Sequence, residues 1–289
     1  MVRTNREAVT AQPLETPYGI LSPAVTVITE ESPTWAGGFQ YETFDSAVTV
    51  TVDPITGADF NAQYTVVSAD KKTPMVRSYL PFAVRAFVSA STMGTNVETL
   101  RKSADQALEV VLQKAIEKEF WTGQLAKQMT DASGNRYLSI TDAVDVTPTE
   151  GTAVKVRYGQ ALLEQALGEG TIGSTGVIHA PLLVASVMDV SDVDGALTTN
   201  LGTKVVAGAG YSNTGPDGEV APTGKAWMYA TGPVTVRIGA MNDPISDKLS
   251  EAIQTGKNTV EFFVDRPAAV TWSTSTLYAV LVDLTLDYA

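Results

Sequence analysis

The chain has 289 residues, of which 44% are hydrophobic and 18% charged, so it can bury a core as one large domain or two ordinary ones. It contains no cysteine, which excludes disulfides, thiolate nucleophiles and cysteine-ligated metals. Its formal net charge of −12 argues against tight phosphate binding over the whole surface, and no uncharged apolar run approaches the roughly 20 residues of a membrane helix.

Charge is unevenly distributed along the sequence. Residues 1–70 carry two basic against nine acidic residues (net −7), residues 71–102 carry six against one (net +5), and residues 139–289 carry eight against seventeen (net −9). Because complementary potentials steer association, a basic segment in an acidic chain favours contact with a second copy. Scattered, solvated charges are the alternative interpretation.

The N-terminal part predicts an arm and a projecting hairpin. Residues 1–33 lack hydrophobic periodicity and are interrupted by four prolines, so we expect an extended arm that is ordered only by packing on another body. The first ten residues lack the apolar core of a secretory signal. Extended patterns in 39–52 and 60–68 flank the turn Asp53–Gly57 and predict a hairpin, and Pro81–Ala90 predicts an apolar strand.

The segment Thr95–Gly123 predicts one unusually long helix. Thr95 and Glu98 fit a capping box at its start, and Gly123 can adopt the left-handed conformation that closes a helix. Apolar residues recur at helical spacing over roughly 27 residues, about 40 Å at 1.5 Å per residue. Such a rod needs a sheet or a neighbouring chain to cover its apolar stripe, so we interpret it as a structural strut.

The rest of the chain predicts a mixture of helices and strands. We expect a helix over 152–167, a short buried strand over 176–180, a helix opened by Pro181, and strands alternating with long loops over 195–224. We then expect a hairpin over 226–239 that turns at Gly232 and Pro233, a short helix over 243–256, and two apolar strands over 258–272 and 277–286.

Two motifs that could carry chemistry are better explained by structural roles. The glycines of Gly168-x-Gly170-x-x-Gly173 follow a predicted helix and precede a strand, the reverse of a dinucleotide site, so a connector is favoured. His179 is the only histidine. Without cysteine or a serine elbow, a hydrogen-bonded core histidine is favoured over a zinc ligand or a triad member.

Acidic and aromatic candidates lead to the same conclusion. The acidic segment 189–194 resembles half a calcium loop, but the first and last ligand positions would be apolar, so we expect an exposed polar loop. Glu117 and Glu119 point to different faces of a helix and are interpreted as surface charges. Phe120 and Trp121 are expected to anchor the end of the long helix to a sheet. We therefore predict no catalytic, cofactor-binding or metal-binding residues, and no enzyme.

Four motifs and the order of the segments carry a resemblance to a known family. EKEFWTG (Glu117–Gly123) is similar to the end of a spine helix, and VIHAP (Val177–Pro181) followed by LGTKVVAGAGYSNTGPDG (Leu201–Gly218) resembles an axial-domain stretch. AWMYATGPVTVR and VDRPAAVTW resemble a closing hairpin and last strands. The chain thus resembles the HK97-type major capsid proteins of tailed bacteriophages, those of actinobacterial phages in particular, over nearly its whole length.

The resemblance implies an α+β chain with the HK97-like capsid fold. The implied parts are an N-terminal arm (1–33), the first part of a peripheral domain (34–50), an extended β-hairpin loop (51–80), the peripheral domain with a spine helix over 96–122 (81–150), an axial domain (151–255) and the closing strands of the peripheral domain (256–289).

The resemblance also implies a function and partners. Copies of a major capsid protein form hexamers and pentamers that close into an icosahedral shell around phage double-stranded DNA. The implied partners are scaffold, portal and minor capsid or decoration proteins, and DNA bound non-specifically, with no membrane and no cofactor. The shell would assemble in the host cytoplasm and become part of the virion. Lys71, Lys72 and Arg77 are the candidates for contacts with acidic patches on an adjacent copy.

Two departures and three alternatives stay open. No motif establishes a partner for a lysine–asparagine cross-link at Lys71 or Lys72, and the arm begins almost at Met1, so we expect a separate scaffold or none. An encapsulin-like nanocompartment shell shares the fold but typically begins with a helix. A β-rich tail or decoration protein would not need the long helix, and an enzyme lacks candidate residues.

Overall fold

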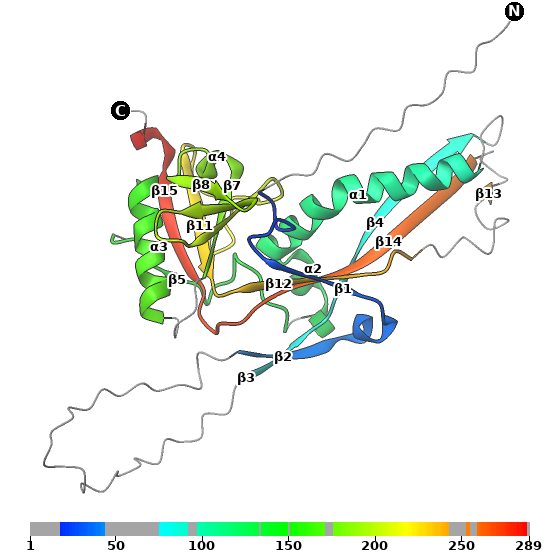
Figure 1. Cartoon of the computed structure of the whole chain (residues 1–289), viewed down its shortest axis with the longest axis horizontal. Coiled ribbons are helices and arrows are strands. Elements are labelled where there is room, and N and C mark those ends of the chain that lie inside the picture. The colour runs from blue at the N-terminus through cyan, green and yellow to red at the C-terminus, as the bar shows by residue number, and fades with distance from the viewer. Residues whose placement is uncertain are drawn as a thin grey trace, which may run out of the picture.

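The computed structural model describes residues 18–43, 75–91, 97–132, 134–149, 151–170, 176–242, 253–254 and 259–287. They form an elongated α+β molecule in which two sheets meet near the middle and a long helix runs along one of them (Figure 1). The elements in chain order are β1 (Thr26–Glu30), η1 (Pro33–Gly37), β2 (Phe39–Thr43), β3 (Met75–Tyr79), β4 (Phe82–Ser91), α1 (Val97–Thr122), α2 (Gln124–Gln128), η3 (Thr130–Ala132), β5 (Val144–Asp145), β6 (Val154–Lys155), α3 (Val156–Gly170), β7 (Val177–Pro181), α4 (Leu182–Ala185), β8 (Val190–Val193), β9 (Ala196–Thr199), β10 (Lys204–Gly208), β11 (Lys225–Thr231), β12 (Val234–Gly239), β13 (Ile253–Gln254), β14 (Thr259–Trp272), β15 (Tyr278–Asp283) and η4 (Leu284–Asp287).

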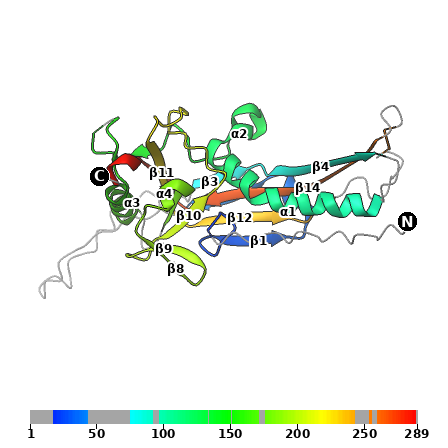
Figure 2. The same ribbon diagram turned by 90° about the horizontal axis from the view of Figure 1, so that it is seen from above.

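The first sheet has five strands and is built around the long strand β14. β12 and β13 pair with one flank of β14, β4 pairs antiparallel with the other, and β1 pairs parallel with β12. Figure 2 shows β4, β14, β12 and β1 following one another across the sheet. Alternate residues of β4 are buried, as a period of two requires when one face is covered: Phe82, Val84 and Ala86.

The helix α1 covers one face of this sheet and confirms the predicted long helix. With 26 residues it is about 39 Å long at 1.5 Å per residue. Gly123 ends it with a φ of 56°, in the left-handed conformation that the sequence predicted. The proposed cap Thr95 lies outside the described residues. The stripe that packs on β4 and β14 recurs at every fourth position: Leu100, Ala104, Leu108, Leu112, Ile116 and Phe120.

The second sheet has eight strands in the order β5–β15–β11–β7–β10–β9–β8, with β6 also paired to β15. It mixes parallel pairs, such as β7–β10, with antiparallel pairs, such as β11–β15. Its two faces belong to different apolar clusters because successive side chains point to opposite faces. One face packs on α3 and α4 through Ile178, Val205, Met228 and Val280. The other joins the cluster beneath α1 through Val177, Val206, Tyr229 and Ala279.

The predicted hairpin over 226–239 is wrong. β11 pairs with β7 and β15, whereas β12 pairs with β1 and β14, so the two strands lie in different sheets. Each strand is flanked on both sides by strands that are distant in sequence, and no flank is left for a local pair. Consequently β12 lies in the first sheet with β4 and β14, and β15 lies in the second sheet. The predicted boundary at 255/256 had instead put β12 in the axial domain and β15 in the peripheral domain.

The expectation that the arm packs only on another body is wrong for residues 18–30. Ile20 and Ala24 are buried in the main apolar cluster, and β1 adds a strand to the first sheet. Hydrophobic periodicity could not reveal this, because the segment is a series of turns followed by one short edge strand. Residues 1–17 lie outside the described residues.

Three predicted helices have different bounds. α3 begins at Val156 instead of 152, because Val154 and Lys155 pair with β15 as β6, and it continues past Gly168 to Gly170. The helix after Pro181 has only four residues. The helix predicted over 243–256 is wrong at Ile253 and Gln254, which pair with β14 as β13, while 243–252 lie outside the described residues.

A two-stranded sheet forms the base of the predicted projecting loop. β2 pairs antiparallel with β3, and the rings of Phe39 and Tyr79 stack with centroids 5.7 Å apart. The predicted strands and turn over 44–74 lie outside the described residues. Within the described residues this ladder ends at the pair Thr43 and Met75.

Candidate functional site

Two short crossings lead directly from a strand of one sheet to a strand of the other, and they are bonded to each other. One crossing is Gly232–Pro233, between β11 and β12, and the other is Ser273–Leu277, between β14 and β15. The Gly232 N–H donates to Thr274 Oγ1 at 3.0 Å, and the Ser273 N–H donates to Pro233 O at 3.1 Å. We call these crossings, together with Glu117–Trp121 at the end of α1, the junction.

Two aromatic residues fix the end of α1 to both sheets, as the sequence predicted. The Phe120 ring lies edge-on to Trp272 of β14, with centroids 5.8 Å apart, and edge-on to His179 of β7, at 5.2 Å. The Trp121 ring packs on Tyr211, in the loop after β10, at 4.6 Å. Because Phe120 and Trp121 are fully buried, these contacts set the direction of α1 relative to both sheets.

His179 is the hydrogen-bonded core residue that the sequence predicted. The Thr231 hydroxyl donates to Gly232 O, so it accepts a hydrogen bond from His179 Nε2 at 3.0 Å. Nδ1 then accepts from the Tyr211 hydroxyl, also at 3.0 Å. This arrangement satisfies a neutral imidazole, and burial lowers the pKa of His179 to about 3.

The interpretation of Glu117 and Glu119 as surface charges is wrong. Glu117 is fully buried; its Oε1 accepts the Ile20 N–H at 3.1 Å and its Oε2 accepts the Gly210 N–H at 2.8 Å. Burial raises the pKa of Glu117. Burial also raises the pKa of Glu119, which is half-buried and accepts the Leu125 N–H at 3.0 Å, in the first turn of α2. The spacing of residues along a helix could not predict that these two side chains are buried, because the groups that they bind lie on other elements.

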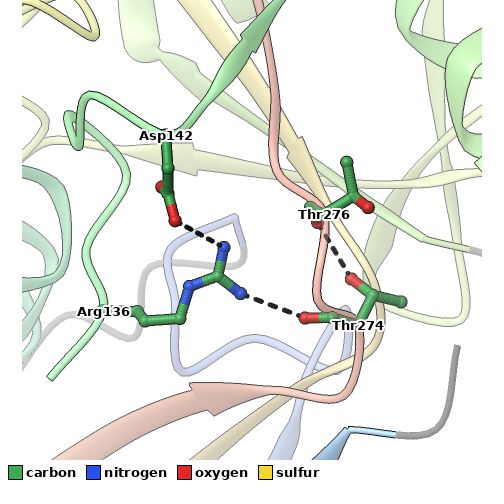
Figure 3. A network of polar contacts seen from close by, with 4 residues as sticks. All are labelled: Arg136, Asp142, Thr274 and Thr276. Carbon is green, nitrogen blue, oxygen red and sulfur yellow. Dashed lines mark hydrogen bonds and ion pairs between the residues drawn. The ribbon is translucent and has the colours of Figure 1, made fainter. Parts of the chain in front are cut away.

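Arg136 contacts the junction and was not predicted from the sequence (Figure 3). Its side chain is 4% exposed, and its guanidinium lies 4.4 Å from the centroid of the Trp272 ring. Nη1 donates to Thr274 O at 3.1 Å, Nη2 lies 3.8 Å from Asp142 Oδ2, and Thr274 Oγ1 donates to Thr276 O at 3.1 Å. One arginine thereby holds the second crossing in place. A single arginine in a turn segment belongs to no periodic sequence pattern, so its burial could not be predicted.

Of the three predicted contact residues, only Arg77 is among the residues that the structure describes. Lys71 and Lys72 lie outside the described residues. Arg77 lies on β3 opposite Tyr41 and is half-buried, and its Nε has no hydrogen-bond partner among the described residues.

The two motifs that were set aside have structural roles. Gly168 and Gly170 lie in the last turns of α3, and β7 follows at Val177, so helix precedes strand as expected. The acidic segment 189–194 is exposed or half-exposed, but it contains β8, the first strand of the hairpin β8–β9, where Asp192 Oδ1 accepts the Gly195 N–H at 2.9 Å. Within the described ranges, no three His, Asp or Glu side chains are grouped so that they could hold a metal ion. Every helix in the described part of the chain is too short or too polar to cross a bilayer.

The β4–β14 ribbon leaves apolar surface exposed on the face opposite α1. Phe87 on β4 is 59% exposed and lies directly opposite Phe263 on β14. Beside them Arg85 forms an ion pair with Asp265 at 3.1 Å, and its guanidinium lies 4.7 Å from the centroid of the Phe263 ring. We call these four residues the ribbon patch. One exposed and one half-buried aromatic ring, flanked by charged side chains, form a patch of the kind that can meet another body.

A groove adjoins the ribbon patch at Asp265. Its volume is about 450 Å³, its apolar lining includes Trp35, Met241 and Pro267, and its acidic lining includes Glu31 and Asp265. The groove therefore combines apolar surface with acidic side chains, of which Asp265 is paired with Arg85.

Solved structures share this arrangement over almost the whole chain. The capsid of an empty GTA particle matches with a TM-score of 0.52 and 13% identity, covering 98% of this chain and 95% of that one. A chain from Mycobacterium phage Cain matches with a TM-score of 0.53 and 12% identity, covering 98% and 94%. The SrpI encapsulin of Synechococcus elongatus matches with a TM-score of 0.52 and 12% identity, covering 96% and 94%.

No protein-family model and no curated protein matches the sequence. The structural likenesses show the fold: the chain has the HK97-like α+β fold of phage capsid and encapsulin shells, as its sequence predicted.

Proposed function

We propose that this chain is the major capsid protein of a tailed double-stranded DNA phage. In this proposal it is a structural subunit that forms hexamers and pentamers of an icosahedral shell. The observation that carries the proposal is the likeness to the GTA capsid chain, which covers 98% of this chain and 95% of that one. The likeness therefore extends over almost the whole of both chains and is not limited to one domain.

The distribution of surfaces supports this role. The ribbon patch and the acidic groove are exposed on the single subunit. In a shell, neighbouring copies would cover them. We assign the first sheet with α1 to the peripheral domain and the second sheet to the axial domain. Residues 1–17 are the arm and residues 51–80 the extended loop. The shell proteins that share the fold favour a structural role over an enzyme.

The proposed partners follow from the same role. Scaffold, portal and decoration proteins would contact the shell, and packaged DNA would lie against it without sequence-specific binding. Assembly would take place in the host cytoplasm, and the finished shell would be part of the virion. An acidic subunit would repel DNA and keep it from adhering to the wall, and at physiological salt this repulsion acts within about 8 Å.

The basic residues before β4 remain our candidates for contacts between copies. We propose that Lys71, Lys72 and Arg77 meet acidic side chains of an adjacent copy, such as Glu31 in the groove. Changing the three basic residues together to Glu should lower shell yield strongly while leaving the melting temperature of the unassembled subunit within about 3 °C. Equal yields of closed shells from the triple variant and the wild type would contradict this assignment.

Negative-stain electron microscopy of the purified chain tests the proposed function. Closed shells, or hexameric and pentameric capsomers, are expected; a monomer that stays dispersed at high concentration would overturn the proposal. The likeness to an encapsulin favours one second candidate, a nanocompartment shell. Particles purified from cells carrying the intact phage genome separate the two: double-stranded DNA inside indicates a capsid, and a protein cargo without DNA indicates a nanocompartment.

A further inference from the structure

Glu117 is the point at which three distant parts of the chain share one side chain. It lies on α1, its Oε1 accepts the Ile20 N–H from the segment that leads into β1, and its Oε2 accepts the Gly210 N–H from the loop after β10. The two donors are 97 and 93 residues away in the sequence. Because Glu117 is fully buried, water cannot replace either donor.

Both donor segments approach α1 closely through a glycine. A Cβ on Gly19 would lie 1.6 Å from Gln113 Nε2 and 2.7 Å from Glu117 Oε1. A Cβ on Gly210 would lie 2.3 Å from Lys114 O and 2.8 Å from Glu117 Cβ. At Gly210 the obstructing atoms include the α1 backbone, so the close approach requires glycine there. At Gly19 they are the ends of the Gln113 and Glu117 side chains, so a Cβ there would push these side chains aside. A side chain at either position would therefore disturb the surroundings of the Glu117 carboxylate.

The segment that Glu117 holds also bridges the two sheets. The Ala207 N–H of β10 donates to Tyr18 O at 2.8 Å, and Lys204 Nζ donates to Pro23 O at 3.1 Å. From there the chain continues into β1, which belongs to the first sheet. Movement of residues 18–25 therefore involves the second sheet at one end and the first sheet at the other.

We propose that Glu117 is a positioning residue that couples residues 18–25 to the loop Ala209–Tyr211. If one segment withdraws, the buried carboxyl group loses a backbone donor and keeps that of the other segment and the Gln113 side chain, so its position shifts and the other segment is held less tightly. In the shell subunit of the proposed function, the direction in which the arm leaves and the orientation of the second sheet would become interdependent. Only that consequence rests on the proposed function, because the coupling is a property of one subunit.

Hydrogen exchange of the unassembled subunit, followed by mass spectrometry, tests the coupling by disturbing one side and reading the other. In Gly19→Ala, amides of the loop Ala209–Tyr211 should exchange at least tenfold faster than in the wild type. In Gly210→Ala, the same acceleration should occur in residues 18–25. Gly168→Ala is the matched control, because a Cβ there meets nothing within 4 Å, and both segments should stay within twofold of the wild type.

The route through the carboxylate is tested by adding Glu117→Gln. That variant alone should speed exchange in both segments, and Gly19→Ala should then change the loop by less than twofold further. Acceleration confined to residues 18–25 in Gly19→Ala, or an undiminished effect in the Glu117→Gln background, would overturn the proposal. Exchange in β14 should stay within twofold throughout, and a rise there would show general destabilisation instead of coupling. Since no shell is needed, failure here is distinct from failure of the proposed function.

Discussion

Lowering the pH should destabilise the subunit through His179, the only histidine in the chain. In the folded protein the imidazole is fully buried between Tyr211 and Thr231, and desolvation lowers its pKa from 6.5 to about 3. In the unfolded chain the same imidazole is exposed to water and accepts a proton near pH 6.5.

The sign and the size of the effect follow from these two pKa values. Between about pH 6.5 and about pH 3, the unfolded state binds one more proton than the folded state at His179, so the free energy of unfolding falls as the pH falls. The loss is about 1.4 kcal/mol for each pH unit and reaches about 5 kcal/mol in total. That is a large share of the roughly 5–15 kcal/mol that stabilises an ordinary protein.

Urea denaturation of the unassembled subunit at pH 7, 6, 5 and 4.5 measures this loss. The carboxyl groups titrate in both proteins, so the comparison of wild type with His179→Gln isolates the imidazole. The free energy of unfolding should fall about 1.4 kcal/mol per pH unit more steeply in the wild type below pH 5.5. Independently, the imidazole resonances of the folded wild type should not titrate above pH 4.5. An NMR midpoint near 6.5 in the folded protein would refute the reasoning, even if His179→Gln fails to fold.

Three further predictions concern the ribbon patch, the junction and the arm. Phe87→Asp should lower the yield of closed shells at least tenfold while changing the free energy of unfolding by less than about 1 kcal/mol, because Phe87 is 59% exposed; normal shells by electron microscopy would contradict it. Arg136→Met should lower the free energy of unfolding in urea by about 2–3 kcal/mol, since Thr274 O loses its donor; a loss under 1 kcal/mol would disprove that role. Deleting residues 1–17 should spare the melting temperature within about 2 °C and prevent shell closure, whereas deleting 1–25, which removes the buried Ile20, should lower that temperature clearly; closed shells from the shorter deletion would count against an arm.

Some residues of the candidate site could be predicted from the sequence and others could not. Phe120 and Trp121 could be predicted as anchors because bulky aromatic residues at the end of an apolar stripe have to be buried. His179 could be predicted as a core residue because it lies in an apolar strand. Glu117 and Arg136 could not, because a buried charge is recognised by its partners, and these come from segments far away in the sequence.

The sequence by itself determined the local elements. The long helix and its glycine stop, the two closing strands and the alternation of strands and loops over 195–224 all follow from periodicity and turn chemistry, which act between near neighbours. Their order was also enough to indicate the fold.

Only the tertiary structure decided which strands pair and which polar groups are buried. β11 and β12 are adjacent in the chain yet lie in different sheets, because each finds two flanking strands that a local hairpin could not supply. The segment 18–30 joins the core because β1 pairs with β12, a strand far away in the sequence. Pairing and burial are settled by competition among all parts of the chain at once, and no local pattern contains the result of that competition.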